Sequence, residues 1–131
     1  MKQNQLIQSI EAAQLKEMVP TFCVGDTLAV HTRITEGGKE RVQVFTGTVI
    51  SRKGRGLAST FSLYRVSYGS GMEKVFMTHS PRIVKLEVMK CGQVRKSKLY
   101  YLRGVSGKKA KVKEKMRPRV QVVKAEPTSS E

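Results

Sequence analysis

The sequence predicts a mainly β protein: a small antiparallel barrel with one helix before it and a basic arm after it. From Phe22 onward, apolar residues alternate with polar ones in five runs separated by short turns, the pattern of half-buried strands. The chain has 131 residues, and its strand region is too short for a two-sheet sandwich of about seven strands. A small barrel fits instead, because it closes the strand edges that an open sheet exposes.

A helix is predicted over residues 4–18. Leu6, Ile7 and Ile10 belong to a loose apolar stripe at helical spacing. Pro20 ends the helix, because the residue before a proline is disfavoured in helical backbone. A helix of about four turns with a narrow stripe is marginal alone. We therefore expect it to dock on the domain or on a partner.

Five strands are predicted to follow, over residues 28–34, 41–51, 59–68, 73–79 and 83–89. Glu36–Lys39 contains two glycines, which tolerate the positive φ that a tight hairpin turn requires. Gly69–Gly71 is expected to turn the chain again. The apolar phase slips near Gly47, which predicts a β-bulge there, and a bulge would let the strand bend round a barrel.

The connection between the second and third strands is a basic glycine loop, Arg52–Leu57. Its three cations, Arg52, Lys53 and Arg55, lie beside flexible backbone that could wrap a phosphate group. An ordinary solvated hairpin loop would have the same composition, so both interpretations stay open.

The stretch Lys90–Met116 is dense in lysine and arginine, and Glu114 is its only acid. Charges this dense repel one another unless an anion neutralises them, and nucleic-acid phosphate is the obvious candidate. Tyr100 and Tyr101 interrupt the charges and could stack on unpaired bases. The alternative is a solvated, disordered basic tail. The apolar block Leu99–Leu102 argues against that alternative.

Within this stretch, an extended strand over residues 108–115 would place Lys109, Lys111 and Lys113 on one side. Their spacing would be roughly 6–7 Å, close to that of phosphates along a nucleic-acid strand. Gly104–Lys109 faintly resembles a nucleotide-binding phosphate loop. It fails that pattern, because two residues instead of four separate its glycines and no Ser or Thr follows its lysines.

The net charge of +15 is distributed asymmetrically along the chain. Residues 1–50 contain five basic and five acidic residues, so the remaining 20 of 25 basic residues lie beyond residue 50. This favours a neutral half that folds or faces protein and a basic half that faces a polyanion. No apolar run is long enough to span a membrane, and no secretory signal is evident.

Catalytic or metal chemistry is not predicted. His31 and His79 have no nucleophile or carboxylate pair at a useful spacing, and the acids are scattered. Cys23 and Cys91 form no CxxC motif, so the sequence indicates neither a zinc site nor a disulfide scaffold. Two such cysteines fit a protein of a reducing compartment. We expect no cofactor, no metal and no enzymatic activity.

Several stretches together resemble the bacterial-type L19 family of large-ribosomal-subunit proteins. They include Phe22 with Gly25–Thr27, Glu36–Gly47, the loop Arg52–Leu57, Thr60-Phe61, His79–Pro81 and Val94–Arg103. The resemblance covers residues 4 to about 116. It implies an SH3-like barrel and a non-enzymatic role in the cytoplasmic ribosome. It further implies binding of large-subunit rRNA near the face that meets the small subunit. A share in an inter-subunit bridge with small-subunit rRNA and contact with a neighbouring large-subunit protein are also implied.

The resemblance assigns RNA contacts to cations and aromatic residues of the loops and the arm. These are Arg52, Lys53, Arg55, His79, Arg82, Arg95, Lys96, Lys98, Tyr100, Tyr101, Arg103, Lys108, Lys109, Lys111 and Lys113. A free-standing RNA-binding regulator with the same barrel is the alternative function.

Four segments are therefore expected. They are an N-terminal helix at residues 1–20, an SH3-like β-barrel at 21–91, a basic RNA-binding arm at 92–117 and a disordered tail at 118–131. We expect the arm to be mobile without RNA.

Overall fold

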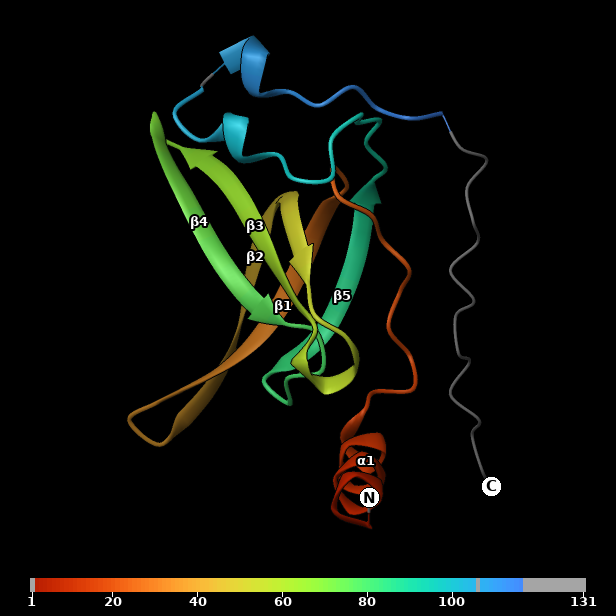
Figure 1. Cartoon of the computed structure of the whole chain (residues 1–131). Helices are drawn as coiled ribbons and strands as arrows, with labels where there is room; N and C mark the ends of the chain where they lie inside the picture. Colours follow the sequence, from red (N-terminus) through yellow and green to blue (C-terminus); the bar gives the residue numbers. More distant parts are fainter. Residues whose placement is uncertain (1, 106, 117–131) are drawn as a thin grey trace, which may run out of the picture.

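The computed structural model describes residues 2–105 and 107–116, which form one α-helix and five strands (Figure 1). Helix α1 spans Lys2–Gln14. The strands are β1 (Thr27–Glu36), β2 (Lys39–Lys53), β3 (Thr60–Ser67), β4 (Ser70–Met77) and β5 (Ile83–Lys90). The chain also forms three short 3₁₀ helices in the described residues: η1 (Gly56–Ala58), η2 (Tyr100–Leu102) and η3 (Gly107–Ala110). The predicted mainly β fold with one N-terminal helix is confirmed. The predicted tail at 118–131 and the last residue of the predicted arm lie outside the described residues.

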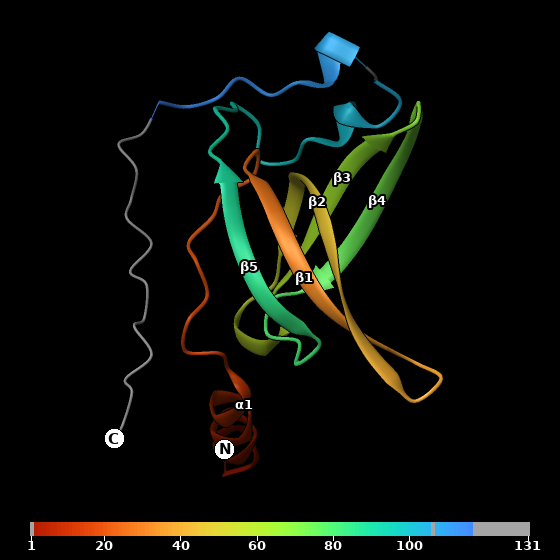
Figure 2. The ribbon, with the colours of Figure 1, turned by 180° about the vertical axis from the view of Figure 1, so that it is seen from behind.

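The five strands form one antiparallel sheet in the order β4-β3-β2-β1-β5. The long strand β2 joins its two halves. Lys39–Thr48 of β2 pairs with β1, whereas Thr48–Lys53 pairs with β3. Figures 1 and 2 show the sheet curving strongly, with β1 and β5 on one side of the bend in β2 and β3 and β4 on the other.

The main core lies on the concave side of this curved sheet and receives side chains from every strand. Its buried members are Phe22, Leu28, Val30, Val49, Phe61, Leu63, Phe76 and Ile83. The edge strands β4 and β5 both contribute, through Phe76 and Ile83. In a flat sheet these two strands would lie roughly 19 Å apart, since neighbouring strands are about 4.8 Å apart. Their shared cluster therefore reflects the curvature.

The hairpin between β1 and β2 has the predicted chemistry. Gly37 and Gly38 form its turn with φ of 55° and 79°, in the left-handed region that glycine adopts without strain. The turn between β3 and β4 differs from the prediction. It lies at Tyr68-Gly69, and Tyr68 itself has a positive φ of 51°. Strand β4 consequently begins at Ser70, inside the predicted turn.

The bulge predicted at Gly47 is displaced along β2. Pairing with β1 runs without a shift from Thr48 to Lys39, so it passes through Gly47 regularly. The shift lies on the β3 side, between Val49 and Ser51. Glycine is required at position 47 for another reason: a Cβ there would lie 2.9 Å from the Tyr64 carbonyl oxygen. Close packing of β2 on β3 therefore explains the glycine.

Helix α1 ends at Gln14, before the predicted boundary, and its residues 4–14 are all exposed. The segment after it is attached to the sheet. The backbone N–H of Lys16 donates to Nδ1 of His79 over 3.1 Å, and its ammonium donates to the Ile83 carbonyl. Burial lowers the pKa of Lys16. Helix α1 itself lies against η1, so the predicted docking on the domain is observed there, although residues 4–14 remain exposed.

A second, smaller core lies on the other face of the sheet. Leu63 and Tyr64 follow each other in β3 and point to opposite faces, so Leu63 joins the main core and Tyr64 the second. Ile50, Leu99 and Leu102 complete the second core. The Leu99 N–H also donates to the Ile50 carbonyl over 2.8 Å. The segment that we expected to be a mobile arm thus supplies half of a buried cluster.

The beginning and end of this arm lie side by side. Gly92 and Glu114 form an antiparallel bridge, and the Gln93 N–H donates to the Lys113 carbonyl over 2.7 Å. The extended strand predicted over residues 108–115 is wrong in its first part, because Gly107–Ala110 forms η3. Gly107 enters η3 with a φ of 73°, a turn that interrupts any regular alternation of lysines.

The buried carboxylate of Asp26 fixes the start of the arm to the sheet. It accepts the Cys23 N–H at 2.8 Å and the Gly92 N–H at 3.0 Å. Gly92 packs so closely here that a Cβ would lie 2.0 Å from the Gly25 carbonyl oxygen. Glycine is therefore required at this crossing.

Candidate nucleic-acid interface

The predicted RNA-binding residues are gathered at two ends of the curved sheet. Figure 1 shows the arm crossing one end, whereas η1 and the connection between β4 and β5 lie at the other. The arm end carries Arg95, Lys96, Lys98, Tyr100, Tyr101, Arg103, Lys108, Lys109, Lys111 and Lys113. The loop end carries the connections with Arg55, His79 and Arg82. Arg52 and Lys53, at the end of β2, lie beside the arm: Lys98 donates to the Arg52 carbonyl, and the charge of Lys53 acts on Tyr100. The structure therefore divides the predicted set instead of forming one surface.

A pocket of about 380 Å³ in the arm brings five of these residues together. Arg95, Lys96, Lys111 and Lys113 line it with Tyr101. The remaining lining residues are Gln93, Val94 and Val112, and none of the lining residues is acidic. Within the part of the chain that the structure describes, none of the four cations pairs with a carboxylate. We call this site the arm pocket.

The second core positions the arm pocket. Val94 and Val112 pack against that core and form an apolar floor. Leu102 is buried in the core while Tyr101 beside it is 51% exposed, so the turn of η2 directs the tyrosine outward. The Lys96 ammonium lies 5.5 Å from the centroid of the Tyr101 ring. The pattern of lysines had indicated the cations, but it gave no sign of the valine floor.

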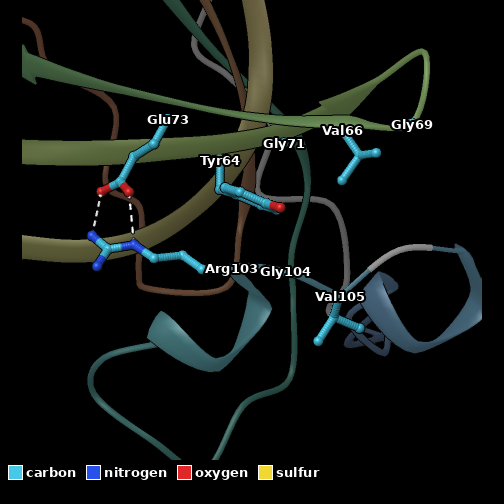
Figure 3. A pocket seen from close by; sticks show the side chains of 8 residues that line it. All are labelled: Tyr64, Val66, Gly69, Gly71, Glu73, Arg103, Gly104 and Val105. Atoms are coloured by element: carbon cyan, nitrogen blue, oxygen red, sulfur yellow. Dashed lines mark hydrogen bonds and ion pairs between the residues drawn. The ribbon is translucent and has the colours of Figure 1, made fainter.

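Arg103 has a different environment from the other predicted contacts. Its guanidinium donates twice to the Glu73 carboxylate of β4, with Nε–Oε2 at 2.7 Å and Nη2–Oε1 at 2.8 Å (Figure 3). Hydrogen bonding to Glu73 raises the pKa of Arg103. The same guanidinium covers the Tyr100 ring at 4.5 Å. Arg103 thus ties the arm to β4 in the free protein.

This ion pair lines a second pocket of about 390 Å³, between the β3–β4 hairpin and the arm. Figure 3 shows Tyr64, Gly71 and Val105 around it. The cation of this pocket is already neutralised by Glu73. It is therefore a poorer site for an anion than the arm pocket, whose cations lack such a partner.

Tyr100 lies between the second core and several cations. A hydrogen bond with the Ser51 side chain is the main cause that lowers the pKa of Tyr100, and the charges of Lys53 and Lys98 act in the same direction. The Lys98 ammonium also donates to the Arg52 carbonyl over 3.2 Å. Lys98 and Tyr100 thus connect the arm to the end of β2.

Arg52 at the end of β2 and His79 at the loop end both have partners within the protein. The Arg52 guanidinium donates to the Phe22 carbonyl and lies 4.6 Å from the Phe22 ring centroid. His79 accepts the backbone N–H of Lys16 through its ring nitrogen Nδ1. By contrast, Lys53, Arg55 and Arg82 are exposed and, in the described residues, make no ion pair. These three cations are therefore accessible to a phosphate.

Two further properties limit the kind of site. Among residues 2–105 and 107–116, no helix is long and apolar enough to cross a membrane. In the same ranges, no group of three or more His, Cys, Asp or Glu residues is placed to hold a metal ion.

A curved antiparallel sheet with unpaired cations around an aromatic ring is typical of small basic proteins that bind nucleic acid. The comparisons with known proteins give the particular family. Residues 5–115 match the family model "Ribosomal protein L19", so the chain belongs to this family of non-enzymatic ribosomal proteins. The resemblance inferred from the sequence motifs is confirmed.

Three relatives, each named "Large ribosomal subunit protein bL19", illustrate the similarity. That of Protochlamydia amoebophila (strain UWE25) is 59% identical over 116 residues, covering 88% of this chain and 86% of the relative. That of Chlamydia pneumoniae is 55% identical over 114 residues, covering 87% and 94%. That of Chlamydia trachomatis serovar L2 is 57% identical over 109 residues, covering 83% and 90%.

Proposed function

We propose that this protein is a structural constituent of the large ribosomal subunit that binds large-subunit rRNA near the subunit interface. Family membership supports the ribosomal assignment, and the relatives are named as proteins of that subunit. The observation that carries the RNA contact is the arm pocket, where four cations without carboxylate partners in the described residues converge. Phosphate groups would relieve their mutual repulsion and release counterions.

The contacts with phosphate position the protein on the RNA and do not read the base sequence. Lysine and arginine contacts to phosphate fix the register and orientation of a protein on nucleic acid. Recognition of folded RNA depends largely on its shape. We assign the direct phosphate contacts to the exposed cations of the arm and to Lys53, Arg55 and Arg82. Arg52, His79 and Arg103 support these surfaces through their contacts within the protein.

The two basic ends of the sheet suit a protein that meets two separate RNA segments. The arm crosses one end and the loops near η1 occupy the other (Figure 2). This arrangement supports the finer proposal that the protein contributes to an inter-subunit bridge in the cytoplasmic ribosome, contacting small-subunit rRNA as well. A neighbouring large-subunit protein would meet surfaces outside these two ends.

The curved sheet supports the proposal of an SH3-like barrel. Its edge strands β4 and β5 share the main core, although the strand order leaves them unpaired with each other. We retain residues 1–20, 21–91 and 92–117 as the helix, barrel and arm segments of this proposal. In the second core, side chains of the strands pack against side chains of the arm, so the barrel and arm segments fold against each other.

The function is tested by sucrose-gradient sedimentation of a cell lysate, followed by a high-salt wash of the large-subunit fraction. A structural constituent should remain in stoichiometric amount after the wash. A free-standing RNA-binding regulator, the alternative function, should be removed by the salt. Absence from the large subunit before the wash would refute the proposed function outright.

A further inference from the structure

We propose that the arm pocket holds one unpaired nucleotide of the RNA, with its base against Tyr101 and its phosphates on the surrounding cations. This inference rests on the proposed function and specifies the ligand of one of its sites. It requires an RNA segment whose base is free of a double helix.

The pocket combines two kinds of surface that a phosphate alone would not need. Arg95, Lys96, Lys111 and Lys113 supply positive charge around the opening. Val94 and Val112 supply an apolar floor, and Tyr101 supplies an aromatic ring that is half exposed. A nucleotide has both an anionic and a flat, weakly polar part. Every base has a face that can stack on a tyrosine, whatever its hydrogen-bonding groups.

The size of the pocket also favours a single nucleotide. Its volume of about 380 Å³ lies at the lower end of the range of small-molecule pockets, which is roughly 300–1,000 Å³. An A-form duplex keeps its bases stacked inside and presents phosphates and sugars, so it could meet the cations but not the floor. Unpaired bases in loops and bulges can be splayed out to reach such a surface.

The position of Lys96 gives a detail of the bound state. Its ammonium lies 5.5 Å from the centroid of the Tyr101 ring, so a cation covers the ring in the free protein. When a base stacks on the ring, the flexible Lys96 side chain moves to a phosphate. A cation–π contact is then exchanged for a stacking contact and a charge-assisted hydrogen bond.

The test is fluorescence anisotropy with the full-length protein and three labelled probes. These are a short single-stranded adenine oligoribonucleotide, an abasic ribose-phosphate chain of the same length and an RNA duplex. Tyr101→Leu should weaken binding of the adenine oligonucleotide by roughly 5- to 150-fold, the effect of losing one base–aromatic stack. It should leave the binding of the abasic chain and the duplex unchanged.

Two variants serve as controls for Tyr101→Leu. Tyr101→Phe keeps the ring and should bind like the wild type. Tyr68→Leu makes the same change at a fully exposed tyrosine of the β3–β4 turn that does not line the arm pocket, and it should have no effect. Because Tyr101 is half exposed, Tyr101→Leu should fold, which urea denaturation would verify.

The cations give a separate readout from the ring. Lys111→Gln with Lys113→Gln should lower the slope of log K against log salt concentration by roughly 0.7 for each single-strand phosphate that the variant no longer neutralises. Tyr101→Leu should leave that slope unchanged, because stacking releases no counterions. Equal binding of the adenine and abasic probes by the wild type would overturn the proposal. Unchanged binding by Tyr101→Leu would overturn it as well.

These outcomes differ from a failure of the proposed function. A protein that remains on the large subunit after the salt wash, but whose Tyr101→Leu variant binds normally, would keep the ribosomal role and lose the nucleotide site. A protein that stacks the adenine probe but never sediments with the large subunit would keep the site and lose the ribosomal role.

Discussion

Leu99→Ala should destabilise the free protein by about 2.5–5 kcal/mol. Leu99 is 0% exposed in the second core with Ile50, Tyr64 and Leu102. Truncation to alanine removes three carbon atoms, which lose about 2.4 kcal/mol of transfer free energy at about 0.8 kcal/mol each. The cavity left behind adds a further term, because a packed core relaxes only in part.

Urea denaturation in the absence of RNA measures this effect. A domain of this size has an m value of about 1–3 kcal/mol/M, so a loss of about 3 kcal/mol shifts the midpoint by roughly 1–3 M. Leu6→Ala is the matched control, because it makes the same change at a residue of α1 that is 64% exposed. That variant should stay within about 0.5 kcal/mol of the wild type.

The experiment separates two descriptions of the arm. If the arm were mobile without RNA, as the density of charge predicts, Leu99 would spend its time in solvent and its truncation would cost almost nothing. A Leu99→Ala variant as stable as Leu6→Ala would therefore refute the second core as a feature of the free protein.

Three further predictions concern the attachment of the arm. Gly92→Ala should destabilise by about 3 kcal/mol or more in urea denaturation, because its Cβ would lie 2.0 Å from the Gly25 carbonyl oxygen. Asp26→Asn should cost about 1–3 kcal/mol in the same assay, because the two backbone N–H groups bond different carboxylate oxygens, and the amide nitrogen that replaces one of these oxygens cannot accept. In a spectrophotometric titration, the Tyr100 phenolate should form below the ordinary tyrosine pKa, and Ser51→Ala should shift this titration upward. Since the folded-state pKa is the lower one, Tyr100 adds stability as pH rises from the folded towards the unfolded pKa, and this contribution is absent below the folded pKa.

Each of these predictions has a clear contrary result. Wild-type stability of Gly92→Ala would mean that Gly92 and Gly25 do not cross as described. Full stability of Asp26→Asn would show that the two N–H groups find other acceptors. An unchanged titration in Ser51→Ala would remove the hydroxyl as the cause of the Tyr100 shift.

The strands could be predicted because their signals are local. Alternation of apolar residues and the Gly37-Gly38 turn depend on neighbouring residues, and the hairpin followed that pattern. The bulge could not be placed, because its position depends on which strand pairs on each side of β2. Gly47 resembled a bulge residue in the sequence, whereas its actual constraint is the Tyr64 carbonyl of the neighbouring strand.

The composition of the candidate site was predicted better than its geometry. The charge pattern indicated the cations of the arm pocket, but their convergence depends on the bridge between Gly92 and Glu114. No short-range pattern predicts that pairing. Arg103 lies among the other cations of the arm and was therefore predicted to contact RNA. Its partner Glu73 lies 30 positions earlier in the chain, so the local sequence did not indicate this ion pair. Only the folded topology brings these two charges together.

The second core also has a consequence for the order in which the protein folds. Ile50 and Tyr64 leave the ribosome that synthesises this chain well before Leu99 and Leu102, which cover them. The strands can therefore pair while one apolar patch is still open to solvent, and contacts of such long sequence separation form slowly. During that interval the nascent sheet is at its most prone to associate with other chains. The basic arm is therefore the last segment to fold, and the exposed apolar patch is removed when the arm covers it.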